Sequence, residues 1–199
     1  MSDTNKLYHF YHIYADGNWK EPTMEHLKAL KDSGLYDELN EISIGIVGSL
    51  ININTVAEYL TRFDKVHIKT FQSEGWEQVT QRLIKDISHL DGKVLYAHTK
   101  GAWNNTEVNP NWRREMTKYN VTEWRTCIED LNTFDCVGIH WMYPVNLPDG
   151  TPFFAGNFWW ANLYHIRKLD YPKLNHRYQA EEWLGSNHCT IKSYKLGHP

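Results

Sequence analysis

Cysteine is scarce in this chain. Its 199 residues include only Cys127, Cys136 and Cys189, and no pair of them has C-x-x-C spacing. Three cysteines cannot form a disulfide framework, so a reducing compartment is the simpler expectation. No stretch approaches the ~18 apolar residues that a membrane-spanning helix needs, and the N-terminus lacks the basic and apolar regions of a signal peptide. These absences favour a cytoplasmic globular protein without a membrane span.

An excess of positive charge is also missing. Lysine and arginine total 21 against 24 aspartate and glutamate residues, which gives a formal net charge of −3. Proteins that bind duplex DNA normally carry a strong basic excess, so the composition gives no strong signal for a nucleic-acid partner. Apolar residues make up 41% of the chain and charged residues 23%, which excludes a disordered, collagen-like or coiled-coil protein. The length suits one domain.

Several common catalytic and nucleotide-binding motifs are absent. The sequence contains no G-x-G-x-x-G, G-x-x-x-x-G-K-[ST] or G-x-S-x-G, so dinucleotide-binding, P-loop and serine-hydrolase functions lose their main support. Eleven histidines occur, but no H-E-x-x-H or Cys/His cluster does, and no metal site is predicted. His9 and His12, three residues apart on a predicted strand, point to opposite faces and are expected to pack in the core.

Aromatic residues, in contrast, are abundant. Nine tryptophans, 12 tyrosines and seven phenylalanines make up 14% of the chain. Tryptophan is rarely used at this density merely to fill a core. Two interpretations carry equal weight: a tryptophan-rich core, or a groove that stacks on a flat polar ligand such as a sugar or a base.

Hydrophobic periodicity predicts alternating strands and helices. This order is typical of an α/β fold, here a single Rossmann-type domain with a mostly parallel central sheet flanked by helices. Ligands of such sheets bind beyond the carboxyl ends of the strands, so the loops at 16–18, 48–49, 70–74 and 98–101 are expected on one rim. The predicted strands are 7–14, 42–47, 65–69, 93–98, 135–141 and 190–196, with a strand or turn at 153–158, and the predicted helices are 21–33, 55–62, 74–90, 109–131, 162–169 and 178–184.

The first segment with chemical character is His98-Thr99-Lys100-Gly101, at the end of an apolar strand. Trp103, Trp112, Arg113 and Arg114 follow it in the chain. A strand end of this kind presents backbone N–H groups, a hydroxyl and cations to one point, which suits a phosphate or diphosphate. The alternative is an ordinary β-turn with a solvated lysine and a glycine at positive φ.

The second segment is Phe153–Ala161, which places five bulky aromatics around Gly156 and Asn157. The glycine would let a ligand approach closely, and the asparagine offers an amide donor and acceptor. A carboxylate beside such an aromatic wall would be partly desolvated, which raises its pKa toward that of a useful base. Glu181 and Glu182 follow on a predicted helix, and at most one of these neighbours can face the site. The alternative is a buried strand with both glutamates exposed.

In this order, these segments resemble a known family. The motifs are an apolar strand ending in H-T-K-G at 95–101, W-R-x-x-M at 112–116, D-x-V-G at 135–138, G-N-F-W-W-A at 156–161 and R-x-x-A-E-x-W-L-G at 177–185. They resemble small glycosyltransferase-like proteins of bacterial surface-polysaccharide loci and of large viruses, which are similar in turn to the rhamnan-synthesis F-type proteins. The resemblance covers most of the chain, and G-N-F-W-W-A is its most specific piece.

The resemblance implies a GT-A-like domain over residues 1–199, with a nucleotide-sugar half at 1–101 and an acceptor half at 102–199. Its implied function is transfer of a sugar from a nucleotide-sugar to a saccharide or glycan acceptor in the cytoplasm, or in the host cytoplasm for a virus. The family fold usually carries Asp-x-Asp, which holds a divalent cation on the diphosphate, but this chain has His98-Thr99-Lys100 there. We therefore expect Lys100, with His98 and Arg113, to neutralise the diphosphate without Mn²⁺ or Mg²⁺.

The same resemblance assigns roles to individual residues. Glu181 is the expected base that deprotonates the acceptor, with Glu182 second, and the stereochemistry of transfer stays open. A non-catalytic sugar- or nucleotide-binding module is the main alternative, and a nucleic-acid-processing α/β factor is the third. The residues expected to bind the donor are Asp16, Asn18, His98, Thr99, Lys100, Gly101 and Arg113, and those expected to form the acceptor platform are Gly156, Asn157, Phe158, Trp159 and Trp160.

Overall fold

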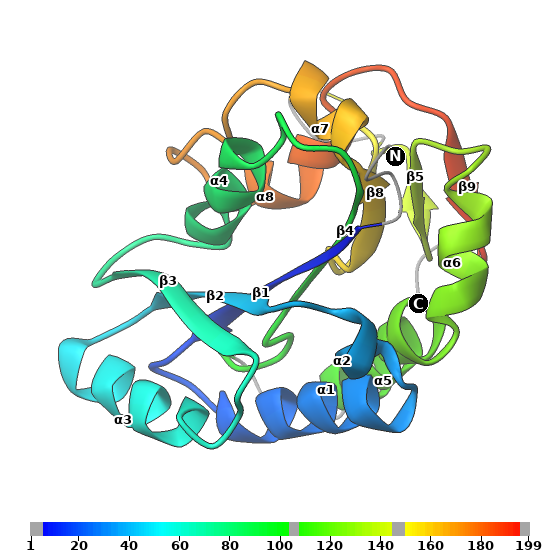
Figure 1. The fold of residues 1–199 in the computed structure, drawn as a ribbon. Coiled ribbons are helices and arrows are strands. Elements are labelled where there is room, and N and C mark those ends of the chain that lie inside the picture. Colours follow the sequence, from blue (N-terminus) through cyan, green and yellow to red (C-terminus); the bar gives the residue numbers. More distant parts are fainter. Residues whose placement is uncertain (1–5, 104–107, 145–149, 196–199) are drawn as a thin grey trace.

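One central sheet organises the fold. The structure is a computed structural model that describes residues 6–103, 108–144 and 150–195. The seven strands of the sheet lie, in order across it, as β3 (Val66–Gln72), β2 (Ile42–Val47), β1 (Leu7–Tyr14), β4 (Lys93–His98), β8 (Trp159–Asn162), β5 (Cys136–Gly138) and β9 (Ile191–Ser193) (Figure 1). The first four in this order are parallel to one another, whereas β8 runs antiparallel to both of its neighbours. The predicted α/β class with a mostly parallel sheet is confirmed.

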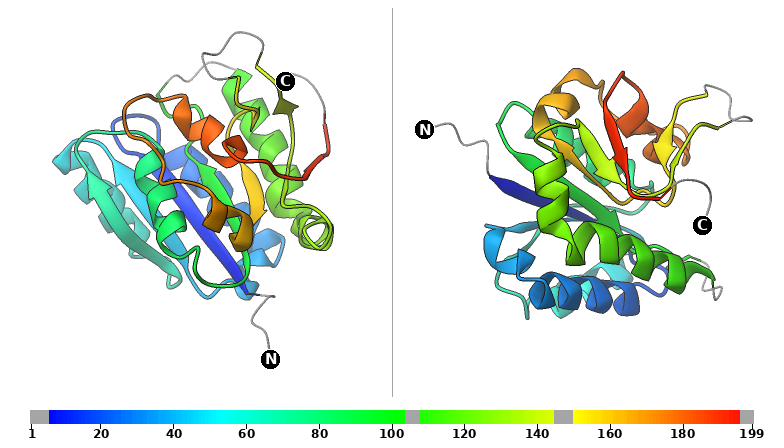
Figure 2. Two further views of the ribbon diagram at one scale, coloured as in Figure 1. Left: turned by 90° about the horizontal axis from the view of Figure 1, so that it is seen from above. Right: turned by 90° about the vertical axis from the view of Figure 1, so that its right-hand side faces the viewer.

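Helices cover both faces of this sheet (Figures 1 and 2). No helix in the described ranges is long and apolar enough to cross a membrane. Each helical layer buries its own apolar cluster against the sheet. One layer holds α1 (Lys20–Asp32), α2 (Leu35–Glu38), α3 (Leu50–Leu60), α5 (Val108–Thr117), the π-helix η1 (Lys118–Thr122) and α6 (Trp124–Asp130), and the other holds α4 (Gln78–Asp86), α7 (Leu163–Lys168), α8 (Gln179–Glu182) and the 3₁₀-helix η2 (Trp183–Gly185).

The central strands β2 and β4 are buried along their whole length, because helices lie on both sides of them. On β1, His9 and His12 point to opposite layers. His9 Nε2 lies 2.7 Å from His26 Nε2 on α1, and His12 Nδ1 lies 2.8 Å from Thr80 Oγ1 on α4. Burial lowers the pKa of His9 and of His12 to about 4. Their predicted place in the core is confirmed.

The predicted helix over 109–131 is interrupted by η1. Trp160 Nε1–H donates to Asn120 O at 2.7 Å, and Asn120 Nδ2 donates to Met116 O. A backbone carbonyl that bonds a side chain outside its helix favours the wider π turn. The helix expected at 55–62 begins earlier, at Leu50. The residue before it, Ser49, has an extended backbone and so marks the start of the helix.

The predicted strands do not include β8, although a buried strand over Phe153–Ala161 is the alternative to the ligand platform. The four residues of β8 are all buried, so they show none of the apolar–polar alternation that marks a half-exposed strand. The strand predicted at 135–141 is two separate strands in the structure. His140, at φ 57°, separates β5 from β6 (Trp141–Met142), which pairs with β7 (Phe153–Phe154) in a second small sheet.

Candidate functional site

A cavity of about 460 Å³ opens at the carboxyl ends of β1 and β4. Its position matches the rim that the parallel strand order predicts for ligands. Backbone hydrogen bonds from Gly48 to Gln72 and from Asn18 to Ala102 join the loops of this rim. We call it the strand-end cavity, and it is lined by His12, Tyr14, Gly75, Trp76, Glu77, His98, Thr99, Lys100, Gly101, Ala102, Trp103, Asn109 and Arg177.

Two tryptophans line the strand-end cavity with rings that are open to solvent. The side chain of Trp76 is 40% exposed and that of Trp103 is 74% exposed. The Trp103 ring lies 5.5 Å from the ring of Tyr14, centre to centre. Exposed indoles at a cavity wall offer free faces on which a base or a sugar ring can stack. The sequence interpretation gave neither tryptophan this role.

Positive charge in the cavity comes from Lys100 and Arg177. The Lys100 ammonium lies 4.1 Å from the centre of the Trp112 ring, and Arg113 Nη1 donates to the backbone oxygen of Lys100 at 2.9 Å. Arg177 is exposed at the edge of the cavity. A lysine ammonium held against an indole and an exposed guanidinium together suit an anionic ligand such as a diphosphate.

Four predicted donor residues line this cavity, namely the strand end His98-Thr99-Lys100-Gly101. The Thr99 hydroxyl accepts a hydrogen bond from the backbone N–H of Tyr14 at 3.0 Å, which ties the ends of β1 and β4 together. Gly101 has φ +85°, and a Cβ there would lie 2.8 Å from that of Asn109. Only glycine fits this turn without strain.

His98 is buried and bonded on both sides. Its Nε2 lies 2.9 Å from the backbone oxygen of Gly156, and its Nδ1 lies 3.5 Å from Glu77 Oε1. Burial is the main cause that lowers the pKa of His98, against the opposing charge of Glu77. A neutral imidazole does not neutralise a diphosphate, so the expected cationic role of His98 is not supported.

Among the described residues, Glu77 is the carboxylate that lines the cavity, and the sequence interpretation missed it. Its Oε2 accepts a hydrogen bond of 2.5 Å from Asn157 Nδ2. Burial favours the neutral acid, but the nearby His98 and His12 and the Asn157 amide outweigh it and lower the pKa of Glu77. No motif marks this residue. Its only signal is its place after the third parallel strand, three residues beyond the predicted loop 70–74.

Glu181 is not one of the lining residues, but its charge interacts with three of them, Lys100, Glu77 and Arg177. Its Oε2 accepts a hydrogen bond of 3.3 Å from the backbone N–H of Gly156. Burial raises the pKa of Glu181, the charge of Glu77 adds to the rise, and Lys100 and Arg177 oppose it. A partly desolvated carboxyl group with a raised pKa has the properties of a general base. Glu182 points elsewhere and lines a separate cavity of about 270 Å³.

Asp16 and Asn18 do not line the strand-end cavity. The Asp16 carboxylate accepts hydrogen bonds from the backbone N–H and hydroxyl of Ser49 and from Asn52 Nδ2, and these bonds lower its pKa. It therefore caps the N-terminus of α3. Asn18 Nδ2 donates to Glu21 Oε2 at 3.0 Å, next to a separate hollow over α1. Both residues shape turns, which is the alternative role of such residues after a strand.

The expectation that Arg113 meets the diphosphate is wrong. Its side chain is buried, and its Nε donates to Glu25 Oε2 at 2.8 Å. The guanidinium is therefore already neutralised by a carboxylate of α1. Because its Nη1 also bonds the Lys100 carbonyl, Arg113 holds the strand-end loop in place and does not face the cavity.

The predicted aromatic platform is also wrong. The side chains of Phe158, Trp159 and Trp160 are 1%, 1% and 0% exposed, so no ring face is available to a sugar. Trp160 fills the apolar cluster beneath one face of the sheet, and Trp159 fills the cluster on the other. Adjacent strand residues point to opposite faces, which lets β8 supply one indole to each core.

Gly156 and Asn157 serve this region as packing and hydrogen-bonding residues. Gly156 has φ +84°, and a Cβ there would lie 2.6 Å from Met116 Sδ and 3.0 Å from the Trp112 ring. Asn157, at φ 57°, donates to Glu77 and accepts a hydrogen bond from Trp159 Nε1 at 2.7 Å. Both residues are buried behind the cavity, so they support its wall and do not touch its open space.

One group of three side chains in the described residues could hold a metal ion. It consists of Cys136, His165 and Cys189 and lies outside the strand-end cavity. The Lys100 ammonium at the end of β4 is a donor and not a metal ligand, so it does not fit the divalent cation that the Asp-x-Asp motif would bind. The strand-end cavity therefore offers cations to an anionic ligand.

The fold and the strand-end cavity define a Rossmann-type α/β protein. The chain belongs to the family described as domain of unknown function DUF8361, which matches residues 10–182. No curated protein matches the chain.

Several solved structures share the fold. HddC from Yersinia pseudotuberculosis is similar with 11% identity and a TM-score of 0.51, over 95% of this chain and 90% of HddC. The structure of HddC complexed with GMP-PN is 11% identical with a TM-score of 0.50, over 94% of this chain and 89% of that one. The 4-diphosphocytidyl-2C-methyl-D-erythritol synthase from Anaerococcus prevotii is 13% identical with a TM-score of 0.50, over 96% of this chain and 87% of the synthase. At these identities the likeness establishes the fold.

Proposed function

We propose that this protein is a transferase that acts on a nucleotide-activated sugar, with the nucleotide in the strand-end cavity. One observation carries the proposal: the cavity combines the open indoles of Trp76 and Trp103 with the cations of Lys100 and Arg177. A nucleoside diphosphate needs both chemistries, because its base stacks on aromatic rings and its phosphates attract cations.

The structural neighbours support a nucleotide ligand. HddC is described in complex with GMP-PN, and the second neighbour is named as a synthase of a diphosphocytidyl compound. The sequence resemblance to glycosyltransferase-like proteins points from nucleotide binding to sugar transfer. A saccharide or glycan is the proposed acceptor.

The proposed reaction is a displacement at the anomeric carbon of the donor sugar. The acceptor hydroxyl oxygen forms the new bond as the bond from that carbon to the diphosphate oxygen breaks, and the nucleoside diphosphate leaves with the electron pair. Lys100 and Arg177 stabilise the negative charge of this leaving group. Glu181 takes the proton of the acceptor hydroxyl, as its raised pKa suits.

Lys100 and Arg177 take the place of a divalent cation in this proposal. Turnover should therefore be the same with and without EDTA, measured as release of nucleoside diphosphate after exhaustive dialysis. An absolute requirement for Mn²⁺ or Mg²⁺ would contradict this part of the proposal and leave the nucleotide site itself untouched.

Ligand binding is tested directly by thermal shift with UDP, GDP, CDP and their sugars. A nucleotide at 100 times its Kd stabilises the protein by about 2.7 kcal/mol. Trp103→Ala should abolish most of this shift, because it removes a stacking face. Tyr143→Ala is the matched control, since Tyr143 is also 74% exposed and lies outside the strand-end cavity. Equal loss in both variants, or no shift with any nucleotide, would rule the site out.

Nucleotide transfer is the second candidate, and the name of the diphosphocytidyl synthase favours it. The two reactions release different products: sugar transfer gives a nucleoside diphosphate, whereas nucleotide transfer from a triphosphate gives pyrophosphate. Chromatography of the products separates them. Binding without either product would identify the non-catalytic module.

A further inference from the structure

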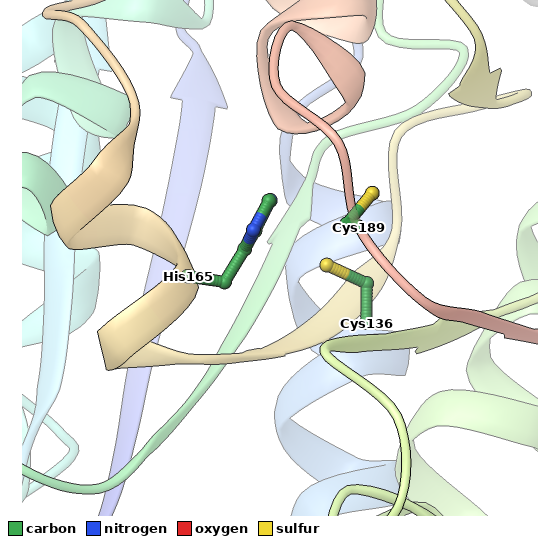
Figure 3. A group of neighbouring side chains, drawn as sticks. All are labelled: Cys136, His165 and Cys189. Carbon is green, nitrogen blue, oxygen red and sulfur yellow. The ribbon is translucent and has the colours of Figure 1, made fainter.

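Three soft metal-ligating side chains meet on the side of the sheet that carries β5, β8 and β9. Cys136 begins β5, His165 lies on α7, and Cys189 lies in the segment between η2 and β9 (Figure 3). Their ligand atoms, two Sγ and one imidazole nitrogen, all lie within 4.8 Å of one another. The three positions are 29 and 24 residues apart along the chain, as their numbers in the sequence give, so only the fold brings them together.

One nitrogen of the buried His165 imidazole has no hydrogen-bond partner among the described residues. His165 is fully buried, and its Nε2 lies 2.9 Å from the backbone oxygen of Leu184, to which it donates. Its Nδ1 has no hydrogen-bond partner in the described residues. A histidine that ligates a metal usually donates its other N–H to a backbone carbonyl or carboxylate, which fixes the tautomer. His165 has this arrangement before any metal is added.

With the two thiols, the three side chains form a set of metal ligands that favours Zn²⁺. Cys136 is fully buried, its thiol points toward His165 in Figure 3, and Cys189 is half-buried beside it. Both cysteines are free. Two thiolates and one neutral imidazole are the ligands that Zn²⁺ takes in proteins, and the two thiolate charges balance the ion.

The nearby carboxylate of Asp135 is already occupied. Its Oδ2 accepts hydrogen bonds from the backbone N–H and hydroxyl of Thr190 at 2.7 and 2.9 Å, and its Oδ1 accepts from the Tyr164 hydroxyl. The described protein ligands therefore number three, and the fourth tetrahedral position is left for water, which reaches the site beside the half-buried Cys189.

We propose that Cys136, His165 and Cys189 bind one Zn²⁺ ion. Binding releases the two thiol protons to solvent, forms two Zn–S bonds and one Zn–N bond at Nδ1, and leaves a water in the fourth position. The ion links β5, α7 and the segment that leads into β9. That link is structural, because β9 is a three-residue edge strand that pairs with β5 alone in the described sheet.

The first experiment measures the metal itself on the full chain. Protein purified under reducing conditions is expected to contain one equivalent of zinc, and chelation should lower its melting temperature. Replacement by Co²⁺ should give a sulfur-to-cobalt charge-transfer band that saturates at one equivalent. Protein that takes up neither ion, with its thiols fully reduced, would overturn the proposal.

The variant Cys189→Ser tests the ligand set. Cys189 is the most exposed of the three ligands, so its replacement disturbs the core least. Loss of a direct ligand should weaken Zn²⁺ binding by more than the ~10–100-fold that loss of an outer-shell partner costs. His188→Ala is the matched control, because the adjacent His188 is exposed and outside the group. Equal affinity in Cys189→Ser and the unmodified chain would also overturn the proposal.

A measurement on the unmodified chain covers the case in which the variant misfolds. Bound Zn²⁺ should slow alkylation of Cys189 by iodoacetamide, located by peptide mass spectrometry. An alkylation rate that does not change on adding Zn²⁺ would contradict the site. A Cys136–Cys189 disulfide that forms readily in air, seen as a mass loss of two hydrogens in protein that never binds Zn²⁺, would replace it with a redox pair.

Discussion

Glu77 and Glu181 interact through their charges, yet their pKa values move in opposite directions. Glu77 gains the Asn157 hydrogen bond and neighbouring imidazoles, which lower its pKa, whereas burial and the charge of Glu77 raise that of Glu181. Two carboxyl groups with separated pKa values can play different roles in one site. Glu77 suits a permanent anion that orders the wall, and Glu181 suits a group that takes and releases a proton.

Glu181→Gln should lower kcat by about 10²-fold or more, because the amide cannot accept the acceptor proton. Donor affinity should stay unchanged. In the unmodified protein the rate should rise with pH through the raised pKa of Glu181, and this limb should vanish in the variant. Glu182→Gln is the control, since Glu182 lines a different cavity. Near-native turnover by Glu181→Gln would remove Glu181 from the mechanism.

The same substitution should stabilise the fold at neutral pH. A carboxyl group whose pKa is raised in the folded state binds more protons folded than unfolded, so it destabilises the protein as pH rises through that range. Glutamine carries no charge to bury. The urea midpoint of Glu181→Gln at pH 7 should therefore exceed that of the unmodified chain, and the difference should shrink toward pH 4. A lower midpoint at pH 7 would show that interactions of the Glu181 carboxylate in the folded protein outweigh the cost of burying its charge.

At the scale of elements, the π turn depends on one hydrogen bond from β8. Trp160→Phe removes the donor to Asn120 O and should lower the free energy of unfolding by about 1–3 kcal/mol more than the lost ring volume does. Trp141→Phe is the matched control, because the buried Trp141 Nε1 has no partner in the described residues. Urea unfolding measures both, and equal losses would show that the bond does not matter.

The elements that the sequence predicts best are those whose environment is uniform. The limits predicted for β1, β2 and β4 match the structure because a strand covered by helices on both faces reads as a bounded apolar run. At β8 the buried-strand alternative is correct and the ligand platform is wrong, because its two tryptophans fill opposite cores. Local pattern cannot tell a ring that packs from a ring that binds.

Some residues of the candidate site could likewise be predicted from the sequence, and others could not. The strand end at 98–101 could be predicted because parallel strands bring their carboxyl ends to one rim. Glu77, Trp76 and Arg177 could not, because each enters from a loop or short helix whose position depends on packing across the sheet. Arg113 shows the reverse error, since it is buried, its partner Glu25 lies 88 residues away along the chain, and no local pattern reveals the pairing.

For the molecule as a whole, we predict that the buried histidines lower the free energy of unfolding in acid. His9 and His12 have a pKa of about 4 when folded against 6.5 when exposed, so the unfolded state binds more protons as pH falls below 6.5. Their contribution is complete above pH 6.5 and is lost progressively toward pH 4, by roughly 3 kcal/mol for each. Urea midpoints should drop steeply from pH 7 to pH 5.

A variant pair separates this effect from general acid denaturation. His12→Gln should flatten the dependence of the free energy of unfolding on pH between 6.5 and 4, because glutamine takes up no proton. His188→Ala, at an exposed histidine, should leave the slope unchanged. A slope unaffected by His12→Gln would mean that other groups govern the acid transition.

Asn157 joins the buried core to the strand-end cavity: its Oδ1 accepts a hydrogen bond from the Trp159 indole N–H, and its Nδ2 donates a hydrogen bond to Glu77. Hydrolysis of that amide to a carboxylate would change almost no volume, but it would set two anions face to face. One of them would have to hold a proton at neutral pH. Spontaneous deamidation of this one buried side chain would therefore change the protonation of the carboxylates in the site. The change would accumulate as the protein ages and would leave the shape of the side chain almost unaltered.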